Sequence, residues 1–251
     1  MENKQREKFL ARLIGLLLTD GSLSQIKKTK VWRISFSSNS VELAKEFQAL
    51  ILTLFGIRTR VREYNGALEI KHTLNKKFVE ELLIYSPTYR TLAKDGRETE
   101  AKIPNFITEN EVFAKEFLRY AFTGDGSVIL NIGRAKYGFR FDRCVKLYCE
   151  HTSLRKQYFD LLTKLGYGPT MLGDAVLLRS PEKLSRFSKE IGFVNDVKIS
   201  GNGLWKGITK SELLQFAVKS YNLKPKALGK TKDDIHANLV RLILRSGYQM
   251  I

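Results

Sequence analysis

The sequence predicts an α+β protein built from two similar halves, and three observations support this fold class. Two helical runs that end in Asp-Gly-Ser stand about half a chain apart, at residues 10–23 and 117–128. Each is followed by an alternating, β-prone segment and then by an apolar helical run that ends at a glycine. Apolar residues make up 43% of the 251 residues, which is enough for a buried core. We therefore expect each half to contain, in order, a helix, strands, a helix, strands and a helix.

The elements of the first half follow from local signals. A helical run ends at Asp20, and Gly56 is the expected C-cap of a later helix. The dipeptide Asn65-Gly66 favours a hairpin turn between two strands. After the first helical run, we expect a strand at 31–37, a helix at 41–55, strands at 57–64 and 67–71, a helix at 75–85 and a polar loop or linker at 86–101.

The second half repeats this order. After its helical run we expect a strand at 138–149, a helix at 154–165 capped by Gly166, a counterpart of the strands at 57–64 and 67–71 at 171–179, and a helix at 181–191. The tail from Lys224 has no counterpart in the first half, and it is basic before a predicted helix at 233–245. We place the boundary between the halves at residue 105, so the second half spans 106–251 and includes the tail from about 224.

The charge and the cysteine count limit the function classes. Lysine and arginine total 43 against 26 acidic residues, for a net charge of +17, and such an excess favours a polyanion such as nucleic acid. Two cysteines, Cys144 and Cys149, cannot build a disulfide scaffold or a four-cysteine zinc site. No apolar run approaches a membrane span, and the N-terminus lacks signal-peptide features. We expect a soluble intracellular protein, cytoplasmic in a prokaryote or organellar.

The two helical runs carry a family resemblance. Leu13 to Gly21 and Leu118 to Gly126 resemble the two copies of the motif that names the LAGLIDADG homing endonucleases, in their single-chain form. The resemblance implies two pseudo-symmetric αββαββα halves. It also implies that the two motif helices form the interface between the halves and that two antiparallel sheets form a saddle over duplex DNA. Helices that pack closely need small residues at the contact. The expected interface residues are Gly15, Thr19, Ala121 and Gly124.

Each motif helix ends by directing one carboxylate toward the base of the helix pair. Asp20 and Asp125 would repel each other there unless a divalent cation lay between them. The resemblance implies that these two acids are catalytic metal ligands, for Mg²⁺ or another cation such as Mn²⁺. In the family, such metals activate water and stabilise the leaving oxygen.

Two lysines are further catalytic candidates. Residues 101–104 resemble the Lys-x-Pro segment before the second motif helix of the family, in which the lysine reaches the active site, and this implies a catalytic Lys102. Lys198 stands in the equivalent segment of the second half, with Ser200 in place of the proline. A cation near the scissile phosphate assists its cleavage.

The alternating strands have one polar, basic face, which suits a major groove. An ordinary solvent face is the plainer alternative. The lysines of the loop at 24–30 are expected to contact phosphate. The candidate DNA-binding residues are Lys27, Lys28, Lys30, Arg33, Ser35, Ser37, Arg58, Arg60, Arg62, Tyr64, Lys71, Arg134, Lys136, Arg140, Asp142, Lys146 and Tyr148.

The expected function is that of a monomeric, site-specific endonuclease that cuts both strands of a long, non-palindromic DNA target. The N-terminal methionine and the lack of flanking protein-splicing sequence favour an intron-encoded enzyme over an intein. Two alternatives stay open: an RNA maturase that assists splicing of its intron, and a DNA-binding regulator that has lost cleavage. The three scattered histidines suggest no metal site, and His151 is expected at the surface.

Overall fold

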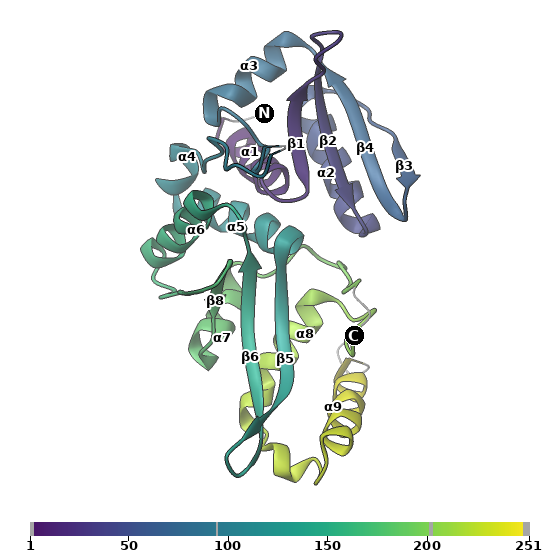
Figure 1. Ribbon diagram of the computed structural model, residues 1–251, viewed down its shortest axis with the longest axis vertical. Coiled ribbons are helices and arrows are strands. Elements are labelled where there is room, and N and C mark those ends of the chain that lie inside the picture. The colour runs from purple at the N-terminus through teal and green to yellow at the C-terminus, as the bar shows by residue number, and fades with distance from the viewer. Residues whose placement is uncertain (1–2, 94, 201–202, 248–251) are drawn as a thin grey trace.

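The computed structural model describes residues 3–93, 95–200 and 203–247, and its elements repeat in the two halves (Figure 1). The first half contains α1 (Asn3–Leu17), β1 (Gly21–Gln25), β2 (Trp32–Ser38), α2 (Val41–Phe55), β3 (Val61–Tyr64), β4 (Ala67–Leu74) and α3 (Lys76–Tyr85). The second contains α4 (Asn105–Thr108), α5 (Glu111–Asp125), β5 (Gly126–Ala135), β6 (Gly138–Tyr148), α6 (Thr152–Lys164), β7 (Thr170–Leu172), β8 (Ala175–Leu178) and α7 (Pro181–Glu190). Helices α8 (Lys210–Lys219) and α9 (Lys232–Gly247) follow. The predicted α+β class is confirmed.

The strands form two four-stranded antiparallel sheets with the same topology. Their orders are β1-β2-β4-β3 and β5-β6-β8-β7. Each sheet has one face against helices, where Phe36 of β2 stacks on Phe47 of α2 with ring centroids 4.6 Å apart. Among the described residues, no helix covers the opposite face of either sheet, and we call it the open face (Figure 1). The matching strand orders support the predicted relation between the halves.

Helices α1 and α5 pack against each other between the two sheets (Figure 1). A Cβ on Gly15 would lie 2.7 Å from the carbonyl oxygen of Phe117, so no side chain fits at this crossing. An ion pair reinforces it, since Arg12 Nε lies 2.8 Å from the carboxylate of the buried Glu116. The contact between the helices therefore depends on a small residue and on a charge pair.

Several local signals produce the elements that the sequence predicts. Ser40 caps α2 by accepting a hydrogen bond from Leu43 N, and Gly56 ends the helix in the left-handed region. Asn65 and Gly66 both have positive φ, as the turn between β3 and β4 requires. The hydroxyl of Thr209 and the carboxylate of Glu212 form a capping box that starts α8.

Four expectations need correction. Strand β3 begins only at Val61, so Arg58 and Arg60 precede it. Strands β1 and β5 start directly at the motif glycines, where no strand was located, and α8 was not predicted. His151 is buried, not exposed. Within the described residues, no helix has the length and hydropathy needed to cross a membrane.

The segment after α7 supports the long β5–β6 hairpin. The indole of Trp205 donates to Leu130 O at 3.0 Å, and Arg143 donates to Ser220 O at 2.6 Å. Helix α9 packs along the same hairpin through Ile235 and Leu239 (Figure 1). The C-terminal segment thus packs on the second half, and among the described residues no comparable helical segment follows α3.

Candidate active site and nucleic-acid interface

The two aspartates of the motif lie at the end of the packed helices α1 and α5. Asp125 is the last residue of α5, and Asp20 follows the last turn of α1. A Cβ on Gly124 would lie 3.2 Å from a carboxylate oxygen of Asp20, so this carboxylate lies against the end of the other helix. The helix contact therefore brings the two acids to one site, as the sequence predicts.

The surroundings favour the neutral form of both acids. Loss of hydration raises the pKa of Asp20 to about 6, while the charge of Lys210 lowers it. The pKa of Asp125 rises to about 7, because of lost hydration and then because of the nearby Asp20 carboxylate. Asp125 is nevertheless exposed to solvent. Two carboxylates that resist ionisation side by side are a place where an added cation is favoured.

Lys210 is the residue that the sequence analysis missed. Its ammonium donates to the carbonyl oxygens of Thr123, at 2.6 Å, and of Gly126, at 2.7 Å, which flank Asp125. Loss of hydration lowers the pKa of Lys210 to about 8, and the two aspartates oppose this shift. The capping box of α8 is readable in the sequence, but nothing there indicates that Lys210 points toward the acids.

A cleft of about 370 Å³ opens beside Asp20. Its walls come from both halves, with Ser37 to Ser40 on one side and Lys198 and Lys210 on the other. Lys198 is exposed, so its ammonium is free to reach a ligand in the cleft. The structure thus brings Lys198 to the site of Asp20, as the sequence predicts.

Lys102 lies on a different segment of the site. Its side chain is exposed, and its backbone N–H donates to Ser86 Oγ at 3.2 Å. The next residue, Ile103, donates its N–H to the Gln157 side chain at 2.7 Å, which ties this segment to α6. The structure records no contact between the Lys102 ammonium and either aspartate.

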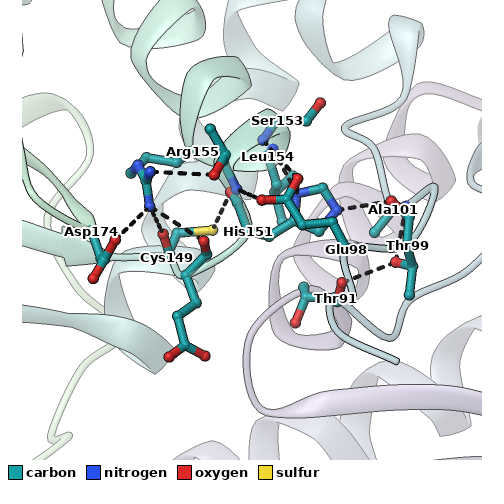
Figure 2. Close-up of polar contacts among 12 residues, drawn as sticks. Thr91, Glu98, Thr99, Ala101, Cys149, His151, Ser153, Leu154, Arg155 and Asp174 are labelled. Atoms are coloured by element: carbon teal, nitrogen blue, oxygen red, sulfur yellow. Dashed lines mark hydrogen bonds and ion pairs between the residues drawn. The ribbon is translucent and has the colours of Figure 1, made fainter. Parts of the chain in front are cut away.

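His151 fastens the linker between the halves to α6 (Figure 2). Its Nδ1 accepts the N–H of Leu154 at 3.0 Å, so its Nε2 donates to Thr99 O, 2.9 Å away. The Glu98 carboxylate accepts the N–H of Thr152 at 2.5 Å. The buried His151 therefore caps α6 and binds the linker through Thr99.

The donor set fits a divalent cation in part. No cluster of three or more histidine, cysteine, aspartate or glutamate side chains that could hold a metal occurs among the described residues. Asp20 and Asp125 would supply two carboxylates. Magnesium accepts such a site, because it commonly takes one or two carboxylates and completes its shell with phosphate and water. The two acids therefore fit a metal that is shared with a phosphate ligand.

The open face of the first sheet carries unpaired cations. The registers of β1 to β4 place Arg33, Ser35, Lys71 and Arg62 on this face. A groove of about 280 Å³ is lined by Arg58, Arg60, Arg62, Glu69, Lys71 and His72. Within the described residues, only Lys71 among the five basic side chains Arg33, Arg58, Arg60, Arg62 and Lys71 has an acidic partner, Glu69. This face therefore attracts anions.

The remaining candidates lie at loops and on the open face of the second sheet. Lys27, Lys28 and Lys30 are exposed in the β1–β2 turn, and Tyr64 and Ser37 are exposed at strand ends. Arg134 and Lys136 are exposed near the tip of the β5–β6 hairpin. Arg140 is neutralised by Asp142, 2.9 Å away, and the Lys146 ammonium lies 5.7 Å from the ring centre of Tyr148. Arg140 on the second open face is thus paired with an acid, whereas the arginines of the first open face have no acidic partner among the described residues.

Comparison with known proteins agrees with this geometry. Residues 7–93 match the LAGLIDADG-like domain. The homing endonuclease I-DmoI, in a mesophilic variant, is similar with a TM-score of 0.52 and 17% identity, over 74% of this chain and 96% of that chain. I-WcaI bound to its DNA recognition sequence has a TM-score of 0.52 and 11% identity, over 81% and 87%. A mutant of I-SmaMI has a TM-score of 0.52 and 12% identity, over 96% and 99%. A comparison with curated proteins found no match.

These similarities confirm the resemblance to the LAGLIDADG homing endonucleases. The first half contains a LAGLIDADG-like domain, and the chain as a whole has the fold of these endonucleases. At these low identities, the similarities to solved structures show a shared fold only. They assign no role to an individual residue of this chain.

Proposed function

We propose that this protein is a homing endonuclease that cleaves both strands of a long, non-palindromic DNA duplex by metal-dependent phosphodiester hydrolysis. The observation that carries the proposal is the pair Asp20 and Asp125, which the contact between α1 and α5 brings together beside Lys210. Loss of hydration disfavours the ionised form of both carboxylates, and a bound cation together with a phosphate would compensate for their charge.

In this proposal, Asp20 and Asp125 hold a divalent cation, Mg²⁺ or Mn²⁺, between the two halves. When bound, the cation polarises the scissile phosphate and makes water a stronger nucleophile. Structures of I-DmoI with its target DNA and Mg or Mn support a metal of this kind. The two carboxylates would hold the cation in their ionised form, since only this form is a ligand.

Two lysines support the transition state. Lys198 is exposed in the cleft beside Asp20, where its ammonium can meet the charge that develops on the phosphate. Lys210 holds the backbone on both sides of Asp125, so it positions this carboxylate and offsets part of the charge of the pair. We assign Lys102, exposed on the segment before α4, a weaker role toward the DNA backbone.

The two open faces bind the duplex. Unpaired arginines on the first face and exposed basic residues on the second supply the phosphate and base contacts. Since the halves differ in sequence, one chain can read two different half-sites and need not dimerise, which supports a monomer and an asymmetric target. I-WcaI bound to its DNA recognition sequence supports double-stranded DNA as the ligand.

The test is cleavage of a plasmid library that carries randomised DNA and candidate intron-insertion sites, with Mg²⁺ or with EDTA, followed by sequencing of the ends. We expect discrete ends on both strands that require Mg²⁺. Asp20→Asn and Asp125→Asn should each abolish cleavage and keep affinity for the recovered site. Asp160→Asn, on the exposed surface of α6, is the matched control and should cut normally.

Other results would favour the alternatives. Specific DNA binding without any cut indicates a regulator. Binding to intron RNA with accelerated splicing, unchanged by the aspartate variants, indicates a maturase. Unchanged cutting by Asp20→Asn or Asp125→Asn removes that residue from the catalytic site.

A further inference from the structure

Residues 219–232, which join α8 to α9, hold five lysines and no acidic residue. We call this segment the lysine strap. On other helices, exposed lysines are neutralised one turn along, as Lys156 is by Asp160 at 2.7 Å. The strap lysines are all exposed, and none has an acidic partner among the described residues: Lys219, Lys224, Lys226, Lys230 and Lys232. Their charge is therefore available to a ligand.

The lysine strap is fastened to the second half near both of its ends. At its start, Arg143 of β6 donates to Ser220 O at 2.6 Å. Near its end, Asn238 of α9 donates to Leu228 O at 2.6 Å. Between these contacts lies a single 3-10 turn, η2 (Pro225–Ala227). The ammonium groups therefore extend from a fixed backbone, so a ligand that binds them loses less affinity to the ordering of the chain.

The lysine strap lies at the end of the β5–β6 hairpin that is farthest from the first half (Figure 1). There η2 packs on β6, and α9 packs on β5. Arg134 and Lys136 are exposed near the tip of the same hairpin. The strap and the hairpin tip therefore give this end of the molecule a basic surface that lies beyond the sheet.

The path of the duplex brings DNA to this surface. In the proposed function, the duplex lies on both open faces, and the two halves follow each other along the longest axis of the molecule (Figure 1). A duplex on both faces therefore runs along this axis and leaves the second half at the tip of the β5–β6 hairpin. Its phosphates continue there, past the base pairs that the sheet can reach.

We infer that the lysine strap binds the phosphate backbone of the duplex DNA that flanks the second half-site. An ammonium on a flexible stem is a point charge that suits phosphate and does not require the planar geometry of a base edge. Phosphate contacts carry no sequence information, but they add affinity and fix the orientation of the protein. This inference rests on the proposed function and adds a sequence-independent anchor on one side of the target.

The experiment measures binding of the catalytically silent Asp20→Asn protein to the target recovered from the randomised library. One duplex ends at the target, and two others extend about ten base pairs, or one helical turn, beyond one end or the other. Extension next to the second half should strengthen binding about tenfold, and the other extension less than about threefold. In Lys224→Gln/Lys226→Gln/Lys230→Gln, this gain should be lost. The slope of log affinity against log salt should become shallower by up to about 2.7, or about 0.9 per lost phosphate contact.

Lys76→Gln/Lys77→Gln/Lys156→Gln is the matched control, since it removes the same charge from exposed positions of α3 and α6. It should keep the gain from extension. All six lysines are exposed, so both triple variants should unfold at the temperature of the parent. An iron chelate on Ala227→Cys, an exposed position of η2, should cut the flanking DNA at one end of the target only and identifies that end. The two native cysteines are buried, so the chelate goes to the new one.

The outcomes separate this inference from the proposed function. Absence of any specific duplex binding by the parent contradicts the proposed function, and this inference with it. Specific binding that is equal for the short and extended duplexes, or equal losses in the two triple variants, contradicts the role of the strap alone. Cuts by the chelate at the end that gives the tighter binding support it. RNA binding that only the strap variant loses, with its DNA binding unchanged, assigns the strap to RNA and contradicts this inference.

Discussion

Thr19 and Gly124 are in direct contact where α1 meets α5: a Cβ on Gly124 would lie 2.5 Å from the Thr19 hydroxyl oxygen. The Thr19 hydroxyl lies within hydrogen-bond distance of two acceptors, Gly15 O at 3.1 Å and Leu16 O at 3.2 Å. Since Asp20 and Asp125 directly follow these two residues, the closeness of the helices sets the separation of the carboxylates. The small residues at the crossing thus determine both the packing of the helices and the placement of the two carboxylates.

Gly124→Ala should destabilise the protein by about 1–2 kcal/mol, because the overpacking cost exceeds the roughly 1 kcal/mol that alanine gains in a helix. Denaturant unfolding measures it. The double variant Thr19→Ala/Gly124→Ala should recover part of the loss. Gly203→Ala is the control, since a Cβ there meets nothing within 4 Å and should change stability by less than about 1 kcal/mol. Equal stability of Gly124→Ala and the parent would show that the helices can separate freely.

Glu116→Gln should cost about 3 kcal/mol at pH 7, because it leaves Arg12 partly buried without its partner. The direction in which this stability difference changes with pH follows from the ionisation of Glu116. Its pKa is lowered from the usual 4.5 by Arg12, against the effect of burial, so the ion pair contributes fully above pH 4.5. That contribution is lost as the pH falls through the folded-state pKa.

Unfolding curves of the parent and of Glu116→Gln should therefore converge at low pH. The control is Glu111→Gln on the same helix, whose exposed pair with Lys115 should contribute less than about 1 kcal/mol at any pH. A difference that stays constant down to pH 3 would mean that packing, and not the charge of Glu116, stabilises the crossing.

The sequence predicts the elements whose signals are local. Ser40 and Gly56 delimit α2, and Asn65-Gly66 defines its turn, because caps and turns depend on a few adjacent residues. Strand β5 escapes prediction because Ile129 places an apolar side chain on the open face, which breaks the alternation. His151 escapes because histidine is not among the common helix caps.

The candidate site likewise contains residues that the sequence predicts and one that it does not. The motif predicts that Asp20 and Asp125 come together, since both end a helix that needs a small-residue partner. It cannot predict Lys210, because the contacts of this side chain with Thr123 and Gly126 join residues far apart in the chain. Nor does alternation alone distinguish the two open faces. That difference is visible only from the strand register, in which Arg62 of β3 and Leu172 of β7 occupy equivalent positions of the two sheets.

Asp20→Asn should stabilise the protein at pH 8 when metal is removed with EDTA. The pKa of Asp20 is raised from 3.8 in the unfolded chain to about 6, so ionisation opposes folding. The contribution of Asp20 to the stability of the parent is then most favourable below pH 4 and is lost as the pH rises through 6, whereas asparagine stays neutral. Thermal unfolding from pH 4 to pH 8 should show the gap widening with pH. With Mg²⁺, the parent should recover stability and the variant should not. A gap independent of pH would contradict the charge repulsion.

Lys210→Met and Lys198→Met should differ in what they lose. Methionine at 210 leaves the carbonyl oxygens of Thr123 and Gly126 without their donor and the aspartates without their cation, so we expect a loss of about 2–4 kcal/mol together with slower cleavage. Lys198 is exposed, so its variant should keep its stability within about 0.5 kcal/mol and still cut more slowly. Unfolding and single-turnover cleavage of both variants separate the positioning lysine from the catalytic one. Slower cleavage by Lys210→Met with unchanged stability would instead indicate direct contact of this ammonium with the DNA.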